Sequence, residues 1–238
     1  MPAEVSNPLA RSAAVLRGLR AALFDVDGTL YRQNLLRMAM ARRLLIHAAT
    51  SPREGWETMR ILRCYRHAQE SMRSQDGQYG DLGAAQIRFA CERSGADEMR
   101  VRRCVGFWIE EQPMPYLLRH RMPKLVEFLE ALKERGIKTA VCSDYPAAAK
   151  LKALGLEKYF DVVKAAQDAD VQRFKPHPRV LEAALAAIGV PTESAVYFGD
   201  RPDVDGAAAR HAGVGFVAIS PRSGFGPVLN MLTTGVDS

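Results

Sequence analysis

The segment Ala21-Ala22-Leu23-Phe24-Asp25-Val26-Asp27-Gly28-Thr29-Leu30 decides the fold, because a short apolar run ends there in two aspartates. A brief apolar run bounded by turn residues is typical of a strand buried on both faces. The aspartates then stand at its carboxyl end, where open α/β sheets bind their ligands. An ordinary Asp-Gly turn after a strand is the alternative interpretation. Two like charges only one residue apart repel each other. A bound cation or a catalytic reaction therefore explains the pair better than an ordinary turn does.

Length and composition set the class of protein. The 238 residues can form one large domain, or a domain with a sizeable insertion, and 47% of them are hydrophobic. No stretch approaches the ~20 apolar residues of a membrane span, and the N-terminal residues do not read as a secretory leader. The four cysteines are far apart and form no paired metal spacing. We therefore expect reduced thiols in a soluble cytoplasmic protein that binds no membrane.

The net charge of +6 is concentrated in one part of the chain, since residues 32–119 hold fifteen arginines, ten acidic residues and no lysine. Such an excess can be a solvated helical face, a lid that attracts anionic substrates, or a nucleic-acid surface. The arginines are spread through helical patterns and form no compact basic block with interleaved aromatics. Nucleic acid is therefore the least favoured partner.

The hydrophobic pattern predicts a split domain with a helical insert. Apolar residues from Leu35 to Ile46 recur at helical spacing, and Ser51-Pro52 marks a helix start with Ser51 as N-cap. Two more helices are expected over 82–93 and 99–110. No alternating strand pattern appears between residues 32 and 118. We place the helical cap domain at 32–119 and the core domain at 1–31 and 120–238, with residues 1 to about 18 as a loose arm.

Beyond the insert, strands and helices alternate, which predicts a parallel, doubly wound sheet of the Rossmann-like α/β class. Helices are expected at 122–135, 146–154, 178–188 and 204–212, with a short one near 228–232. Strands are expected at 20–24, 137–142, 160–165, 195–198 and 215–219.

Three later segments carry polar residues of the kind that an anion or metal site needs. Ser143 follows the second predicted strand, and its hydroxyl can donate a hydrogen bond to an oxyanion. Lys175 stands in Phe174-Lys175-Pro176-His177-Pro178, where two prolines stiffen the loop. The stretch Gly199-Asp200-Arg201-Pro202-Asp203-Val204-Asp205 is rich in carboxylate oxygens, which hard cations prefer. A helix N-cap, a surface lysine and an acidic helix start are the respective structural alternatives.

Taken together and in this order, these strings resemble the four motifs of the haloacid dehalogenase-like superfamily. The resemblance covers residues 20–30 and 122–220, and the insert lies where that superfamily carries its helical C1 cap. It implies a sheet of order 5-4-1-2-3, which would bring Asp25, Ser143 and Asp200 side by side. It also implies a Mg²⁺ site formed by Asp25, the backbone carbonyl of Asp27 and Asp200, with Asp205 orienting a water or Lys175.

The resemblance implies a phosphoryl-transfer mechanism as well. Asp25 would attack phosphorus, and Asp27 would protonate the leaving group and then activate water. Lys175 would neutralise the carboxylates, while Ser143 and the backbone near Gly28 would bind the phosphate oxygens. Asp144 and Asp203 receive no assigned role.

Several functions share this core and stay open. A dehalogenase does not use a second aspartate at position 27, and a phosphonatase of this type needs a cap lysine that 32–119 lacks. A Mg²⁺-dependent phosphatase acting on a small anionic phosphomonoester is favoured. A phosphosugar mutase and a non-catalytic phosphate-binding module are the alternatives. Whether the protein is a monomer or a homodimer is left undecided.

Overall fold

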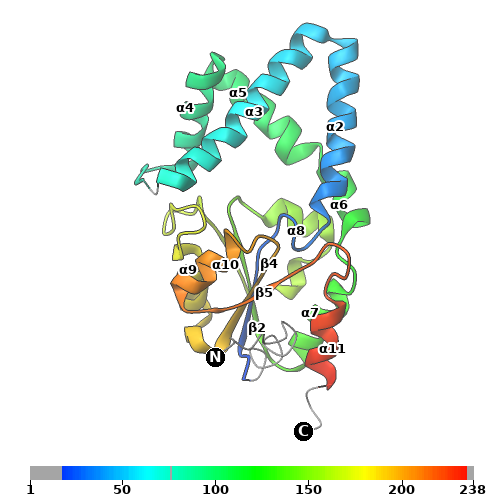
Figure 1. Cartoon of the computed structure of the whole chain (residues 1–238), viewed down its shortest axis with the longest axis vertical. Helices are drawn as coiled ribbons and strands as arrows, with labels where there is room; N and C mark the ends of the chain where they lie inside the picture. The colour runs from blue at the N-terminus through cyan, green and yellow to red at the C-terminus, as the bar shows by residue number, and fades with distance from the viewer. Residues whose placement is uncertain (1–17, 76, 235–238) are drawn as a thin grey trace, which may run out of the picture.

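The computed structural model describes residues 18–75 and 77–234, so the expected N-terminal arm lies almost entirely outside the described residues. Its centre is a sheet flanked by helices (Figure 1). The sheet has five parallel strands in the order β3-β2-β1-β4-β5. The strands are β1 (Ala21–Phe24), β2 (Lys138–Ser143), β3 (Val162–Ala165), β4 (Ala195–Gly199) and β5 (Gly215–Ala218). The predicted order 5-4-1-2-3 and the Rossmann-like class are therefore confirmed.

Helices cover both faces of the sheet, as crossover connections require. One face packs against α7 (Leu125–Glu134), α8 (Ala148–Leu154) and α11 (Gly226–Thr234), and the other against α9 (Arg179–Ile188) and α10 (Asp205–Ala212). Successive side chains of β1 alternate between these layers, because Ala22 and Phe24 belong to the first core and Ala21 and Leu23 to the second. All four are fully buried, as the apolar run predicts.

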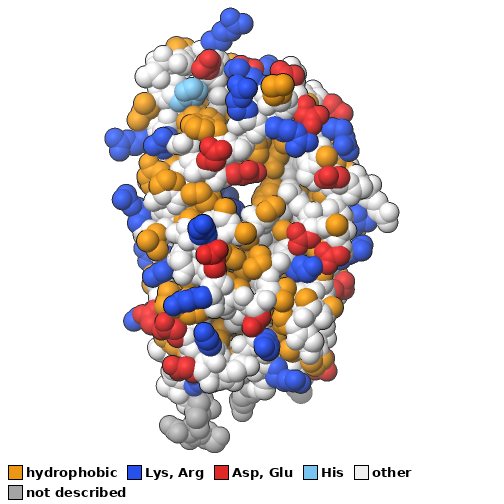
Figure 2. Space-filling view, turned by 180° about the vertical axis from the view of Figure 1, so that it is seen from behind, with side chains coloured by type: hydrophobic (Ala, Val, Ile, Leu, Met, Phe, Trp, Pro, Cys, Tyr) orange, Lys and Arg blue, Asp and Glu red, His pale blue; other side chains and the backbone are white. Residues whose placement is uncertain are grey.

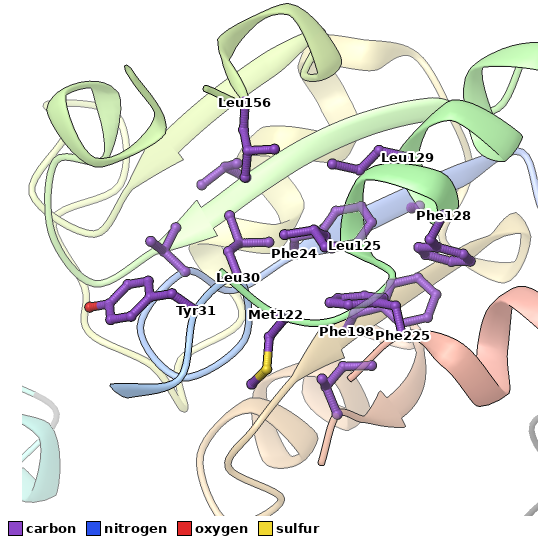
Figure 3. Close-up of a cluster of buried hydrophobic side chains, with 14 of the residues drawn as sticks. Phe24, Leu30, Tyr31, Met122, Leu125, Phe128, Leu129, Leu156, Phe198 and Phe225 are labelled. Atoms are coloured by element: carbon purple, nitrogen blue, oxygen red, sulfur yellow. The ribbon is translucent and has the colours of Figure 1, made fainter. Parts of the chain in front are cut away.

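An aromatic cluster fixes the first core layer directly behind the end of β1 (Figure 3). The ring of Phe24 stacks on Phe198 of β4 with centroids 5.1 Å apart, and Phe128 of α7 stacks on Phe225 at 5.3 Å. Offset aromatic pairs add stability beyond the area that they bury. The residues after Phe24 therefore start from a rigid base.

The segment between β1 and α7 is helical, and we call residues 33–120 the helical insert. It comprises α2 (Gln33–Thr50), α3 (Pro52–Gln75), α4 (Leu82–Ser94), α5 (Glu98–Val105), a π-helix (Gly106–Glu111), α6 (Met114–Leu117) and a 3-10 turn (Leu118–His120). These helices stand over the carboxyl edge of the sheet (Figure 1). Its two connections to the core run side by side, since Arg32 N–H donates to His120 C=O (2.8 Å) and Met122 N–H to Leu30 C=O (2.9 Å).

The helices differ in detail from what the sequence pattern suggests. Helix α2 has apolar residues at helical spacing, but only Leu36 is buried, while Met38, Leu45 and Ile46 are more than half exposed. Helix α2 packs mainly against α3 at the margin of the insert, so it lacks neighbours for a full apolar face. The helices expected from residues 122 and 146 begin later, at 125 and 148.

Within the described residues, we find no helix that has both the length and the apolar character needed to cross a membrane.

Candidate active site

The carboxyl ends of three neighbouring strands bring the predicted site residues together. Strand β1 lies between β2 and β4, with Phe24 paired to Val141 and Phe198. The Asp25 N–H still bonds to the Phe198 carbonyl (2.9 Å), which extends the ladder by one residue before the chain turns away. Sheet pairing therefore places the carboxylate of Asp25 beside the loop that follows β4 and carries Asp200.

Lys175 is the central cation of this edge. Its ammonium donates to Asp25 Oδ1 at 2.6 Å, to Asp205 Oδ1 at 2.8 Å and to the Tyr197 hydroxyl at 2.9 Å. Burial disfavours the charged lysine, but the charge of Asp25, followed by those of Tyr197 and Asp205, keeps the pKa of Lys175 well above its usual range. Only 3% of the side chain is exposed, so this is a fixed positive charge inside the protein.

One lysine does not neutralise the acids around it. Burial raises the pKa of Asp25 to about 8, against the charge of Lys175, and the charges of Asp205 and Asp27 raise it further. Burial, with the charge of Asp205, also raises the pKa of Asp200 to about 6. Carboxylate oxygens of Asp25, Asp200 and Asp205 lie within 4.8 Å of one another. An all-oxygen cluster with surplus negative charge fits a hard cation such as Mg²⁺.

Both carboxylate oxygens of Asp205 accept hydrogen bonds from the protein. Besides Lys175, Oδ1 accepts from the Tyr197 hydroxyl (3.3 Å), and Oδ2 accepts from the Arg201 backbone N–H (3.1 Å). These bonds hold Lys175 and the loop after β4 in position. Asp203 is exposed and forms an ion pair with the Arg201 side chain at 2.9 Å.

Gly28 is required by the close approach of two loops. Its φ of 105° lies in the region that only glycine adopts readily. A Cβ built on Gly28 would lie 2.1 Å from Asp200 Oδ2. Any side chain there would push the Asp200 carboxylate out of the acid cluster.

Asp27 has its own cation, which the sequence analysis missed. The ammonium of Lys150, on α8, donates to both carboxylate oxygens of Asp27 at 2.6 and 2.7 Å, and the Tyr31 hydroxyl donates to Oδ1. Burial opposes ionisation, yet Lys150 and Tyr31 lower the pKa of Asp27 below its usual value. Nothing in the local sequence distinguishes Lys150 from Lys152, since only the packing of α8 turns one of them toward Asp27.

The loop after β2 holds the two remaining candidates. Ser143 is buried, and its Oγ accepts from the Tyr145 N–H at 3.3 Å. The Asp144 carboxylate connects three segments: it accepts from the Lys175 backbone N–H (3.1 Å), from Gln69 Nε2 (3.2 Å) and from the Arg73 guanidinium (2.5 Å). Because Gln69 and Arg73 belong to α3, Asp144 ties the helical insert to the loop that carries Lys175.

A cavity of about 590 Å³ separates the sheet edge from the helical insert. A hollow is visible between the upper and lower halves of the molecule in Figure 2. Its floor includes Asp25, Asp27, Lys150, Lys175, Asp200 and Asp205, and its walls include Arg37, Arg66 and Arg73 of the insert. Ser143 is not among the described residues that line it. A small anionic molecule fits such a space.

Comparison with known proteins agrees with this geometry. A family model for haloacid dehalogenase-like hydrolases matches residues 19–213. The chain belongs to this family. It is 32% identical over 206 residues to a glyceraldehyde 3-phosphate phosphatase of Methanopyrus kandleri, covering 84% of each chain. It is 38% identical over 122 residues to a phosphoglycolate phosphatase of Rhodospirillum rubrum, covering 50% of this chain and 49% of that one.

Solved structures of haloacid dehalogenase-like hydrolases share the fold. A subfamily IA, variant 1 hydrolase from Geobacter sulfurreducens superposes with a TM-score of 0.56 at 25% identity, covering 85% of this chain and 87% of that one. The L-2-haloacid dehalogenase of Xanthobacter autotrophicus reaches 0.60 at 19% identity, covering 92% and 84%. The second likeness supports the fold alone.

Proposed function

We propose that the protein is a Mg²⁺-dependent phosphatase that hydrolyses a small anionic phosphomonoester through an aspartyl-phosphate on Asp25. The observation that carries the proposal is the separation of two carboxylates with different partners. Asp25 lies in the acid cluster with Lys175, while Asp27 lies apart with Lys150 and Tyr31. One group can therefore act as nucleophile and the other as acid and base. Matches to proteins named as phosphatases support the same reaction class.

The first half-reaction transfers the phosphoryl group to the protein. A carboxylate oxygen of Asp25 forms a bond to phosphorus while the bond from phosphorus to the substrate oxygen breaks. Asp27 gives its proton to that oxygen, so the leaving group departs as a neutral alcohol. Thr29 donates to the other oxygen of Asp25 (3.1 Å) and Lys175 to the first, which fixes the orientation of the nucleophile.

The second half-reaction releases phosphate. Asp27, now ionised, takes a proton from water, whose oxygen attacks phosphorus as the bond to Asp25 breaks. In the substrate-free protein Lys150 and Tyr31 keep Asp27 in this ionised form, since together they lower its pKa. An arriving phosphate dianion competes for the charge of Lys150, which favours protonation of Asp27 for the first half-reaction.

Mg²⁺, held by Asp25 and Asp200 and by the backbone carbonyl of Asp27, would supply positive charge that keeps Asp25 ionised and screens the phosphate oxygens. Asp205 would act through Lys175, to which it is bonded. Ser143 and the backbone around Gly28 would bind phosphate oxygens once substrate is present. The predicted cap domain, residues 32–119 over a core of 1–31 and 120–238, would exclude bulk water from the cavity.

The test is phosphate release from a panel of small phosphomonoesters with Mg²⁺ and with EDTA. We expect turnover with Mg²⁺ only. No release from any member by folded protein would contradict a phosphatase and favour a phosphate-binding module. Interconversion of phosphosugar isomers after priming with a bisphosphate, with little phosphate release, would instead identify a mutase.

A further inference from the structure

The cations that line the cavity fall into two groups, and only one group is neutralised by the protein. Lys150 is paired with Asp27, Lys175 with Asp25 and Asp205, and Arg73 with Asp144. Arg201, near the same edge, is paired with Asp203. These pairs account for every core cation of the cavity within the described residues.

Arg37 of α2 and Arg66 of α3 form the second group. Both line the cavity, and neither makes a hydrogen bond or an ion pair in the described part of the chain. The pKa of Arg66 is lowered, first by burial and then by the charge of Arg37, so the two guanidinium groups that line this cavity repel each other. Glu110 also lines this space, but no ion pair joins it to either arginine within residues 18–75 and 77–234.

Arg37 and Arg66 belong to the helical insert, so the cavity lies between them and the sheet edge that carries Asp25 and Asp27. The charge of Arg37 acts on Tyr31, whose hydroxyl bonds to Asp27, the proposed acid for the leaving group. Arg66 lines the cavity together with Tyr145, which stands in the loop that follows β2. A phosphate held at Asp25 would therefore direct the rest of its substrate toward these two arginines.

We propose that Arg37 and Arg66 bind a second anionic group of the substrate, a carboxylate or a further phosphate carried by the leaving group. This inference rests on the proposed phosphatase function. Guanidinium groups suit the site because their planar donors pair with carboxylate and phosphate oxygens in bidentate fashion. A ligand anion between them removes the repulsion that the substrate-free protein carries. The pair thus selects substrates with two separated negative charges over those with a neutral tail.

The experiment compares substrates that differ only in this second charge. Phosphoglycolate and 2-hydroxyethyl phosphate have a carboxylate and a hydroxymethyl group on the same short skeleton, and fructose 1,6-bisphosphate against fructose 6-phosphate tests a second phosphate. The ratio of kcat/KM within each pair measures the preference for the anion. The pair with the larger ratio identifies whether carboxylate or phosphate is the natural group.

Arg37→Met and Arg66→Met should each lower the ratio for the preferred pair about tenfold to a hundredfold, through a higher KM for the charged member. The neutral member should keep its kcat/KM, which also shows that the variants fold. Arg66→Lys should restore part of the preference. Arg63→Met, an exposed arginine on α3 that does not line the cavity, is the matched control and should leave the ratio unchanged.

An unchanged ratio in the double variant Arg37→Met/Arg66→Met, with both substrates still turned over, would overturn the proposal while leaving the phosphatase intact. If wild-type protein releases no phosphate at all, the proposed function fails instead. In that case, calorimetric titration with phosphoglycolate and with 2-hydroxyethyl phosphate tests the anion site without turnover. A preference for phosphoglycolate that is lost in the double variant would uphold the anion site, and equal affinities would reject it.

Discussion

The sheet edge and the helical insert treat charge in opposite ways. At the edge, Lys175 is buried and bonded to Asp25 and Asp205, and the geometry leaves little freedom to any of the three. Across the cavity, Arg37 and Arg66 are exposed to the hollow and have no acidic partner in the described residues. A cluster whose charges are held in fixed positions suits chemistry, which needs preorganised charges. Uncompensated charges suit recognition, because the ligand completes them.

The largest effect should come from Asp25→Asn. The amide keeps the shape of the side chain but cannot form the acyl-phosphate, so we expect phosphate release to fall by at least ~10³-fold. Because burial raises the pKa of Asp25 to about 8, loss of its charge should not lower the melting temperature. Phosphate release and thermal unfolding, measured together, check both statements. Activity close to wild type would refute the assignment of the nucleophile.

Lys175→Met should damage both function and stability. It leaves the buried carboxylate of Asp205 without its cation, which costs about 3–5 kcal/mol in the free energy of unfolding. The loss of a preorganised charge should reduce kcat by about 10²–10³-fold. Denaturant unfolding and steady-state kinetics provide the measurements. A variant as stable as wild type would mean that the acids are neutralised in another way.

Lys150→Met should change the pH dependence of turnover. Lys150 contributes to lowering the pKa of Asp27, so without it the ionised base forms only at higher pH. We expect the acid limb of the kcat profile to move to higher pH and kcat at neutral pH to fall about tenfold. Lys152→Met, exposed on the same helix, should leave the profile in place. A limb that does not move would exclude Lys150 as a positioning residue for Asp27.

Mg²⁺ should stabilise the protein more at high pH than at low pH. Protons compete with the metal for Asp25 and Asp200, whose pKa values are raised to about 8 and 6. Without metal, folded Asp25 retains a proton that the unfolded chain has lost above pH ~4, so stability should decrease as pH rises from about 4 to 8. Saturating Mg²⁺ at pH 8.5 should raise the melting temperature by about 5–10 °C. Asp200→Asn should abolish most of that gain.

The smallest effect is expected where the two regions touch. Arg73→Met removes the 2.5 Å ion pair to Asp144 but leaves Gln69 and the Lys175 backbone as partners of Asp144. We expect KM to rise about threefold with little change in kcat, because closure of the insert becomes less favourable. Steady-state kinetics with the best substrate is the measurement. A large loss of kcat would instead show that Arg73 touches the reacting groups.

Features that depend on neighbouring residues could be predicted from the sequence, whereas contacts between distant residues could not. The run before Asp25, the prolines around Lys175 and the acids after β4 are local patterns, and they predicted the parallel sheet and its order through the resemblance to a known family. Helix α2 shows the limit, since its apolar spacing was evident but the absence of a covering neighbour was not. Lys150 is a second example, because the local sequence does not show which lysine of α8 faces Asp27. Only the packing of the helix decides this.

The sequence by itself determined which residues stand at the ends of the buried strands. A short apolar run that ends at turn residues is a pattern of neighbouring residues, so it can be recognised without the structure. Tertiary structure alone decided that Lys150 meets Asp27, that Asp144 joins α3 to the Lys175 loop, and that Arg37 and Arg66 share one cavity without a partner among the described residues. Asp27 and Lys150 lie 123 positions apart in the sequence, and Asp144 and Arg73 lie 71 positions apart, so nothing holds these residues together in the unfolded chain. These contacts form because the folded sheet and the helical insert hold the charged residues at fixed positions, close enough for their charges to interact.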